Sequence, residues 1–143
     1  MKTIGQLIGT APRPPIAVTP EDTVLTALKT MANMNIGAVV VVESGRLVGI
    51  FSERDYARKV ILCGKNSTDT KVAEIMTGKV LYVSPAHTVS QAMALMTEKH
   101  VRHMPVLDTH NTLLTVISLG DLVKETISDQ AFQIQQLEQY IAG

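Results

Sequence analysis

The sequence predicts an α/β (α+β) fold built from two copies of one unit. The strongest observation is an internal repeat: residues 18–24, Val-Thr-Pro-Glu-Asp-Thr-Val, return 65 positions later as Val-Ser-Pro-Ala-His-Thr-Val at 83–89. A second block, Gly-Ile-Phe-Ser-Glu-Arg-Asp at 49–55, returns 66 positions later as Thr-Val-Ile-Ser-Leu-Gly-Asp at 115–121. In each copy a helical apolar pattern precedes short β-branched runs. Two such copies can pack about a pseudo-twofold axis and leave a cleft between them.

The first helix of each copy is predicted to begin at a hydroxyl residue followed by proline, Thr19-Pro20 in copy one and Ser84-Pro85 in copy two. A hydroxyl side chain caps free N–H groups, and proline needs no hydrogen bond at the first helical position. Apolar residues then recur three and four positions apart and give each helix one apolar face. These residues are Val24, Leu28 and Met31 in copy one, and Val89, Met93 and Met96 in copy two.

Two strands are predicted to follow each of these helices. In copy one they are residues 38–42 and 47–51; the first run is continuously apolar, which is typical of a strand covered on both faces. In copy two they are residues 104–107 and 113–117. Pro105 has no backbone N–H, so we expect its strand to lie at an edge there or to be paired on one side only.

A further helix is predicted to open at Ser52, ending near Gly64, and another at Ser118. With a short extended lead before the first helix, each unit therefore runs strand-helix-strand-strand-helix. Short lead-in helices are expected at 3–8 and 71–76, and a Gln-rich helical stretch at 132–141, which either packs on the body or on a second subunit. The predicted organisation is a first motif at 4–64, a linker at 65–71, a second motif at 72–128 and a C-terminal helical extension at 129–143.

Composition narrows the class of protein. A hydrophobic fraction of 45% with 18% charged residues is typical of a globular domain. Thirteen basic and thirteen acidic residues cancel, which argues against nucleic acid or a membrane as a partner. The strongly apolar stretch at 36–42 is too short to span a bilayer. A single cysteine, Cys63, suits a reducing compartment, so we expect a cytoplasmic protein.

Together these residues resemble the CBS domain, the motif named after cystathionine β-synthase, two of which in tandem form a Bateman module. The resemblance runs from about Ile4 to Ile127. It rests on the Val-x-Pro-x-x-Thr-Val opening, the strand ending in Gly49-Ile50-Phe51-Ser52-x-x-Asp55, the segment 71–77 and the second full copy. It implies two motifs packed through their sheets about a pseudo-twofold axis, similar to stand-alone bacterial pairs of signal-transduction or inosine-monophosphate-dehydrogenase-related type.

The resemblance also implies a regulatory adenine ligand between the motifs: AMP, ADP, ATP or NAD, with S-adenosylmethionine ranked behind them. An ionised Asp can accept hydrogen bonds from both hydroxyls of a ribose, and the start of a helix suits a phosphate. The first implied site consists of Val18, Ala38, Ser52, Arg54 and Asp55. The second consists of Val83, Arg102, His103, Met104, Pro105, Ser118 and Asp121.

Ser-x-x-Asp is also close to a capping box, a purely structural device, and one residue can serve both purposes. Copy two carries Arg102 and His103 where copy one has Gly37 and Ala38, so the second site is predicted to be better built for phosphate. Thr115, in the place of Gly49, is expected to narrow that second site.

No convincing nucleophile, acid–base pair, metal-ligand spacing or phosphate loop is found in the sequence, so no enzymatic activity is predicted. We expect a ligand-sensing module that signals to an unknown effector through its conformation or its packing as a homodimer. The alternative is a constitutive dimerisation or protein-interaction module whose nucleotide sites are non-functional.

Overall fold

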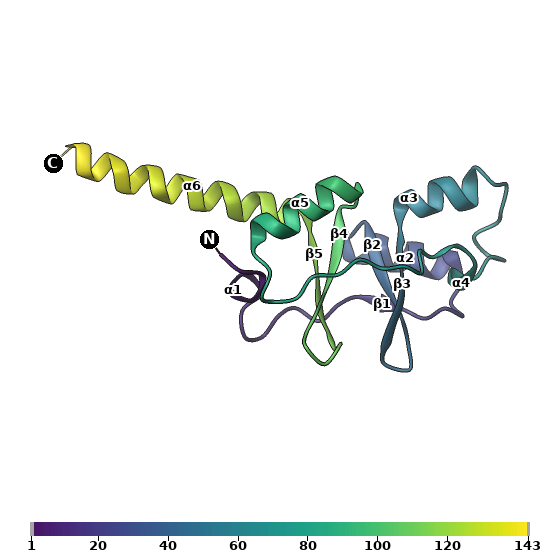
Figure 1. Cartoon of the computed structure of the whole chain (residues 1–143). Coiled ribbons are helices and arrows are strands. Elements are labelled where there is room, and N and C mark those ends of the chain that lie inside the picture. The colour runs from purple at the N-terminus through teal and green to yellow at the C-terminus, as the bar shows by residue number, and fades with distance from the viewer. Residues whose placement is uncertain (1, 143) are drawn as a thin grey trace.

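The computed structural model describes residues 2–142, with side chains through residue 139. The chain combines helices with strands, as Figure 1 shows, and the predicted α/β class is confirmed. Gly143, the last residue of the predicted extension, lies outside the described residues. The elements are α1 (Ile4–Ile8), β1 (Ala17–Val18), α2 (Val24–Met34), β2 (Ala38–Glu43), β3 (Arg46–Ser52), α3 (Glu53–Asp55), the π-helix η1 (Tyr56–Ile61), α4 (Val72–Ile75), α5 (Val89–Lys99), β4 (His103–Leu107), β5 (Leu113–Ser118) and α6 (Leu119–Ala142).

The strands form two small sheets, β1-β2-β3 from copy one and β4-β5 from copy two. β1 is parallel to β2, and both hairpins are antiparallel. Ala38 pairs with Ser52 in the first hairpin, and His103 pairs with Ser118 in the second. The two hairpins therefore have the same register, which places each Ser-x-x-Asp at the same end of its sheet.

Pro105 explains why the second sheet has one strand fewer. In copy one, Val40 donates its backbone N–H to the carbonyl of Ile16 at 3.3 Å. Pro105 occupies the position of Val40 in β4 and has no N–H to donate. The lead segment of copy two therefore pairs with β4 only through a single bridge at Val83, whose N–H donates to the carbonyl of Pro105 at 3.1 Å.

The predicted helix starts at Thr19 and Ser84 are wrong: the helices begin later, with Thr23 and Thr88 as their N-caps. Residues 19–22 form a turn instead. Asp22 donates its N–H to the carbonyl of Thr19 at 3.1 Å, and its carboxylate accepts the N–H of Thr19 at 2.8 Å. Proline is favourable at the second position of such a turn, just as it is at the first position of a helix.

Two hydrophobic cores lie under the two sheets, and each lead-in helix belongs to the core of the opposite copy. Ile4 of α1 is buried in the second core, and its N–H donates to the carbonyl of His87 at 2.8 Å. Val72 of α4 is buried in the first core, and its N–H donates to the carbonyl of Asp22 at 2.8 Å. This exchange ties the two copies into one body.

The helix that opens after Ser118 and the Gln-rich stretch are one continuous helix, α6, of 24 residues and about 36 Å. Figure 1 shows it projecting beyond the body, and every described side chain from Ile127 to residue 139 is exposed. Within residues 2–142, no helix combines the length and the apolar character needed to cross a membrane.

Candidate functional site

Both Ser-x-x-Asp sequences form capping boxes. The N–H of Ser52 donates to Asp55 Oδ2 at 3.0 Å, and the N–H of Asp55 donates to Ser52 Oγ at 3.2 Å. In copy two the N–H of Ser118 donates to Asp121 Oδ2 at 3.2 Å, and the N–H of Asp121 donates to Ser118 Oγ at 3.0 Å. The structural reading of these residues is therefore correct in both copies. Each box occupies one carboxylate oxygen and leaves the other for a second partner.

In copy one that second oxygen is already occupied. Asp55 Oδ1 lies 3.2 Å from Lys59 Nζ and accepts a hydrogen bond from Thr77 Oγ1 at 3.3 Å. The Asp55 side chain is only 14% exposed. Lys59 Nζ also donates to the carbonyl of Ile75 at 3.2 Å, so the lysine is itself held in place. The chain itself thus supplies partners for both carboxylate oxygens of Asp55.

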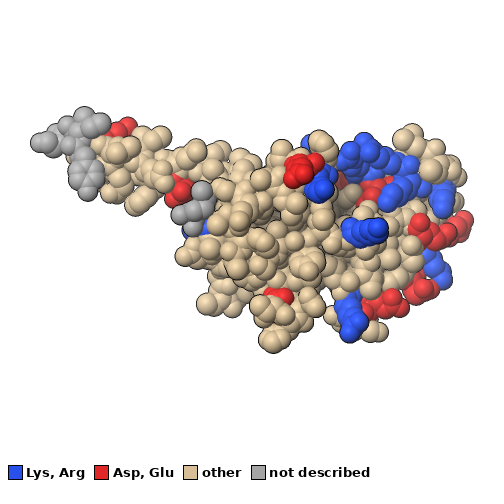
Figure 2. Space-filling model, in the orientation of Figure 1, with Lys and Arg blue, Asp and Glu red and all other residues tan. Residues whose placement is uncertain are grey.

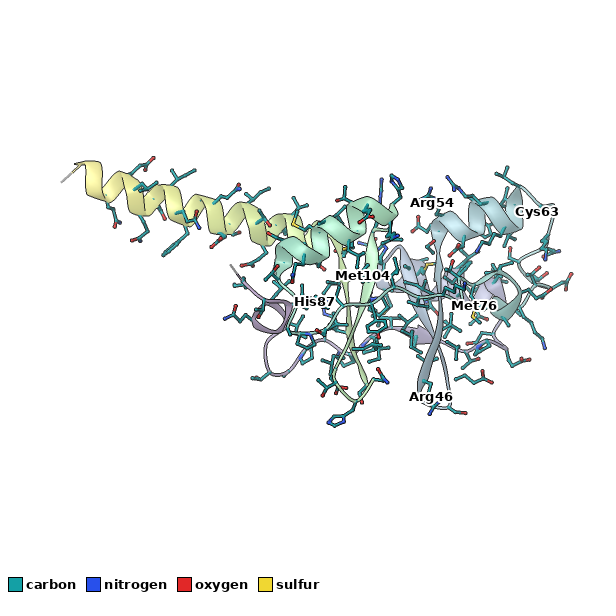
Figure 3. The ribbon with its side chains drawn as sticks, in the orientation of Figure 1. Arg46, Arg54, Cys63, Met76, His87 and Met104 are labelled. Atoms are coloured by element: carbon teal, nitrogen blue, oxygen red, sulfur yellow. The ribbon has the colours of Figure 1, made fainter. Side chains whose placement is uncertain are left out.

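The segment that carries Thr77 lies directly on β3. Ile50 and Thr77 exchange two backbone hydrogen bonds of 3.0 and 2.9 Å. A Cβ on Gly49 would lie 2.6 Å from Met76 Sδ and 3.1 Å from the carbonyl oxygen of Thr77. Figure 3 places Met76 beside β3, on the side of copy one away from α6. Gly49 is therefore required for a close approach that covers Asp55.

Copy two lacks this cover. The position equivalent to Lys59 is Glu125, which pairs with Lys2 at 2.7 Å. Asp121 is exposed, and among the described side chains no hydrogen bond or ion pair reaches its Oδ1. The position of Gly49 is taken by Thr115, which is buried at a cavity wall. Thr115, expected from the sequence to narrow the second site, thus forms part of the wall of a cavity that Asp121 also lines.

Asp121 lines a cleft of about 340 Å³ between the two copies. One wall comes from copy one and the other from copy two, so neither copy forms the cleft alone. A second cavity of about 530 Å³ adjoins it and shares Arg13, Thr115, Val116 and Asp121. The cleft residues are Arg13, Pro14, Pro15, Ile16, Met34, Asn35, Ile36 and Ala38 from copy one, and His103, Thr115, Val116, Ser118 and Asp121 from copy two.

His103 lies where the two copies touch. A Cβ on Gly37 would lie 3.3 Å from His103 Cε1. Burial lowers the pKa of His103 below its ordinary value of 6.5, and the positive charge of Arg102 lowers it further. The negative charges of Asp121 and Glu53 oppose this and raise it, but burial dominates. His103 is therefore neutral at pH 7, and a bound anion would favour its protonated form.

The other predicted site residues are divided between the cleft and its surroundings. Ala38, a residue of the first predicted site, lines the cleft together with Asp121 of copy two. Arg54 points away from Asp55 and donates to the carbonyl of His100 at 3.0 Å, between the end of α5 and the start of α3 (Figure 3). Val18, Val83 and Met104 are buried in the two hydrophobic cores, and Pro105 is buried in β4.

Arg102 lines a different groove, on the other side of the start of α6. Sequence reasoning missed Arg13 at the cleft, and it missed Lys59 and Thr77 at Asp55. The repeat contains the signal for Arg13: if two copies interlock about a twofold axis, the lead segment of one copy meets the Ser-x-x-Asp of the other.

A family model described as the CBS domain matches this chain twice, over residues 6–62 and 72–128. The mitochondrial CBS domain-containing protein CBSX3 of Arabidopsis thaliana is 42% identical over 130 residues, which cover 87% of this chain and 63% of that protein. The CBS domain-containing protein YhcV of Bacillus subtilis is 32% identical over 114 residues and 80% of both chains.

Solved structures agree with the sequence comparison. A signal-transduction protein with CBS domains from Burkholderia ambifaria is 48% identical, with a TM-score of 0.85 over 90% of this chain and 96% of that chain. Two fold relatives contain adenosine compounds: MJ0100, with 5′-methylthioadenosine and S-adenosyl-L-methionine, is 22% identical (TM-score 0.79), and PAE2072 of Pyrobaculum aerophilum, with AMP, is 23% identical (TM-score 0.74). The chain belongs to the CBS-domain family and carries two CBS domains in tandem.

Proposed function

We propose that this protein is a non-enzymatic regulatory module that binds an adenine nucleotide in the cleft at Asp121. The observation that carries the proposal is the contrast between two equivalent carboxylates. Asp55 is covered by Lys59 and Thr77, whereas Asp121 keeps one oxygen free at the wall of a cleft. A capping role alone needs no cleft and no free oxygen.

The cleft offers a partner for each part of a nucleotide. The free oxygen of Asp121 accepts hydrogen bonds from ribose hydroxyls. Ile16, Ile36 and Ala38 provide an apolar wall for the base. Arg13 supplies a fixed positive charge for phosphate, and His103 gains one when an anion raises its pKa.

AMP is the ligand we rank first. The cleft volume of about 340 Å³ lies near the lower end of the usual range for small-molecule sites. ADP, ATP and NAD need the adjoining cavity as well, and S-adenosylmethionine carries no phosphate for Arg13. The relatives with AMP and with S-adenosyl-L-methionine support the view that this fold accommodates adenosine compounds.

Because both copies contribute walls to the cleft, a bound nucleotide favours whichever arrangement of the copies brings its partners together. We propose that this change, transmitted through the packing of a homodimer, is the signal that an effector protein reads.

The test is a thermal-shift panel with AMP, ADP, ATP, NAD and S-adenosylmethionine on three proteins: wild type, Asp121→Asn and Asp55→Asn. The two variants are matched, because each changes the acid of one capping box. A ligand at one hundred times its dissociation constant adds about 2.7 kcal/mol of stability, which is several degrees for a domain of this size. We expect the AMP shift to survive in Asp55→Asn and to vanish in Asp121→Asn.

A second function is favoured by one observation: both Ser-x-x-Asp sequences are complete capping boxes, and the chain itself fills one of the two sites. The protein would then be a constitutive interaction module. On this view no nucleotide shifts the melting temperature of any of the three proteins, and isothermal titration with AMP shows no binding.

A further inference from the structure

The exposed side of α6 carries a regular row of four apolar residues and one glutamine that the body does not cover. Its members alternate at spacings of four and three residues, the period of helices that pair side by side. We call this row the α6 seam: Val123, Ile127, Gln130, Ile134 and Leu137. The four apolar members are among the exposed large hydrophobic residues of the described chain.

The proximal half of the seam forms one wall of a groove of about 490 Å³. Val123, Lys124 and Ile127 line it from α6, and Arg102 and His103 line it from the segment before β4 and its first residue. Arg102 and Lys124 give this groove two positive charges.

The distal half of α6 is opposite in charge to this groove, but it cannot reach the groove of its own molecule. Residues 129–142 contain Asp129 and Glu138 and no Lys or Arg. Figure 2 shows that charged side chains gather on the body and are sparse on the distal helix. Because α6 is one unbroken helix of about 36 Å that leads away from the body, its distal half can fill only the groove of another molecule (Figure 1).

We propose that α6 pairs antiparallel with α6 of a second copy of this chain, so that the distal half of each helix lies in the groove of the other. Twofold symmetry then places Gln130 next to Ile134 of the partner subunit near the centre. At both ends Lys124 lies beside Glu138 of the partner subunit. The antiparallel helix dipoles also favour this arrangement over a parallel one, in which no Lys or Arg of the distal half of the partner's helix would be available to Glu138.

The first test compares two substitutions two residues apart. Ile134 is 55% exposed and lies in the seam, whereas Phe132 is 60% exposed and lies about 200° around the helix from it. Analytical ultracentrifugation should show a wild-type dimer. Ile134→Asp should weaken it by roughly a hundredfold, because each dimer buries this position twice, and Phe132→Asp should change its dissociation constant less than threefold. A wild-type monomer, or equal effects of the two substitutions, would overturn the proposal.

The second test addresses orientation. Lys124→Glu and Glu138→Lys should each weaken the dimer about fivefold, and the double variant should recover wild-type affinity. Within one helix these residues lie about 21 Å apart, so recovery requires a contact between subunits. If the double variant is weaker than either single one, antiparallel pairing is wrong. Far-ultraviolet circular dichroism confirms that each variant remains folded.

This inference does not rest on a ligand in the cleft. A dimer that forms through the seam but fails to bind nucleotides would leave the interface intact and remove only the proposed sensing function.

Discussion

Substituting Gly49 by alanine tests whether the close approach of residues 76–77 to β3 is what covers the first site. The added Cβ would lie 2.6 Å from Met76 Sδ and 3.1 Å from the carbonyl oxygen of Thr77. The methionine side chain can rotate away. The Thr77 carbonyl oxygen cannot, because two backbone hydrogen bonds to Ile50 hold that residue.

Overpacking of this kind costs about 1–3 kcal/mol. We expect Gly49→Ala to lower the free energy of unfolding by that amount, and to do so without removing any apolar side chain from the core. The strain also pushes Thr77 away from Asp55, so the variant should show faster hydrogen exchange at the amides of Ile50 and Thr77 than wild type.

Urea denaturation followed by circular dichroism measures the effect, with Gly78→Ala as the control. Gly78 belongs to the same segment, but a Cβ there would meet nothing within 4 Å, so its change should stay within about 0.5 kcal/mol. If the two variants unfold at the same urea concentration, residues 76–77 do not press on β3, and their approach is not what covers Asp55.

Individual contacts give four further predictions. Glu53→Gln should lower the pKa of His103 further, in an NMR titration, because the negative charge of Glu53 raises it across the junction of the copies. The depressed pKa means that the contribution of His103 to stability is complete above about pH 6.5 and is lost as the pH falls through the folded value, which urea melts at several pH values can follow. Ser118→Ala removes a helix cap and should cost about 1 kcal/mol in urea denaturation. Pro105→Val restores a backbone donor, and its amide should be protected from hydrogen exchange as strongly as that of Val40; rapid exchange would show that proline is not what shortens the lead strand.

Repetition made the fold largely predictable from the sequence. Each element was seen twice, so a weak signal in one copy was supported by the other, and the strand pairs and the Ser-x-x-Asp caps lie where the pattern placed them. The helix starts failed because a hydroxyl followed by proline suits both an N-cap and a turn. Contacts with residues far along the chain decided between them: the N–H of Val24 donates to the carbonyl of Thr70, and the N–H of Val72 donates to that of Asp22.

The candidate site was only partly predictable, because here too contacts with residues far along the chain decide the outcome. A motif in the sequence shows which carboxylate can bind, here Asp55 or Asp121, but not which groups the fold brings to it. Lys59 is one helical turn after Asp55, and in copy two its place is taken by Glu125. That exchange of charge is visible in the repeat. The reach of Thr77 and the placement of Arg13 depend on how the copies interlock, which no local pattern records.

The cleft and the groove are not independent surfaces, because His103 and Ser118 line both of them. If both proposals hold, a nucleotide that attracts His103 from one side alters a wall that the helix of the partner subunit contacts from the other. Thermodynamic linkage requires the coupling to be reciprocal: because each dimer has two clefts, saturating AMP must change the dimer dissociation constant by the square of the factor by which dimerisation changes the affinity of each cleft for AMP. Ultracentrifugation with and without saturating AMP gives the first factor, and titration of wild type against the monomeric Ile134→Asp variant gives the second. Factors that differ from one and obey this relation would make the shared wall the route by which the ligand controls assembly. If both factors equal one, AMP binding and dimerisation are not coupled. The signal would then have to leave the cleft by another surface.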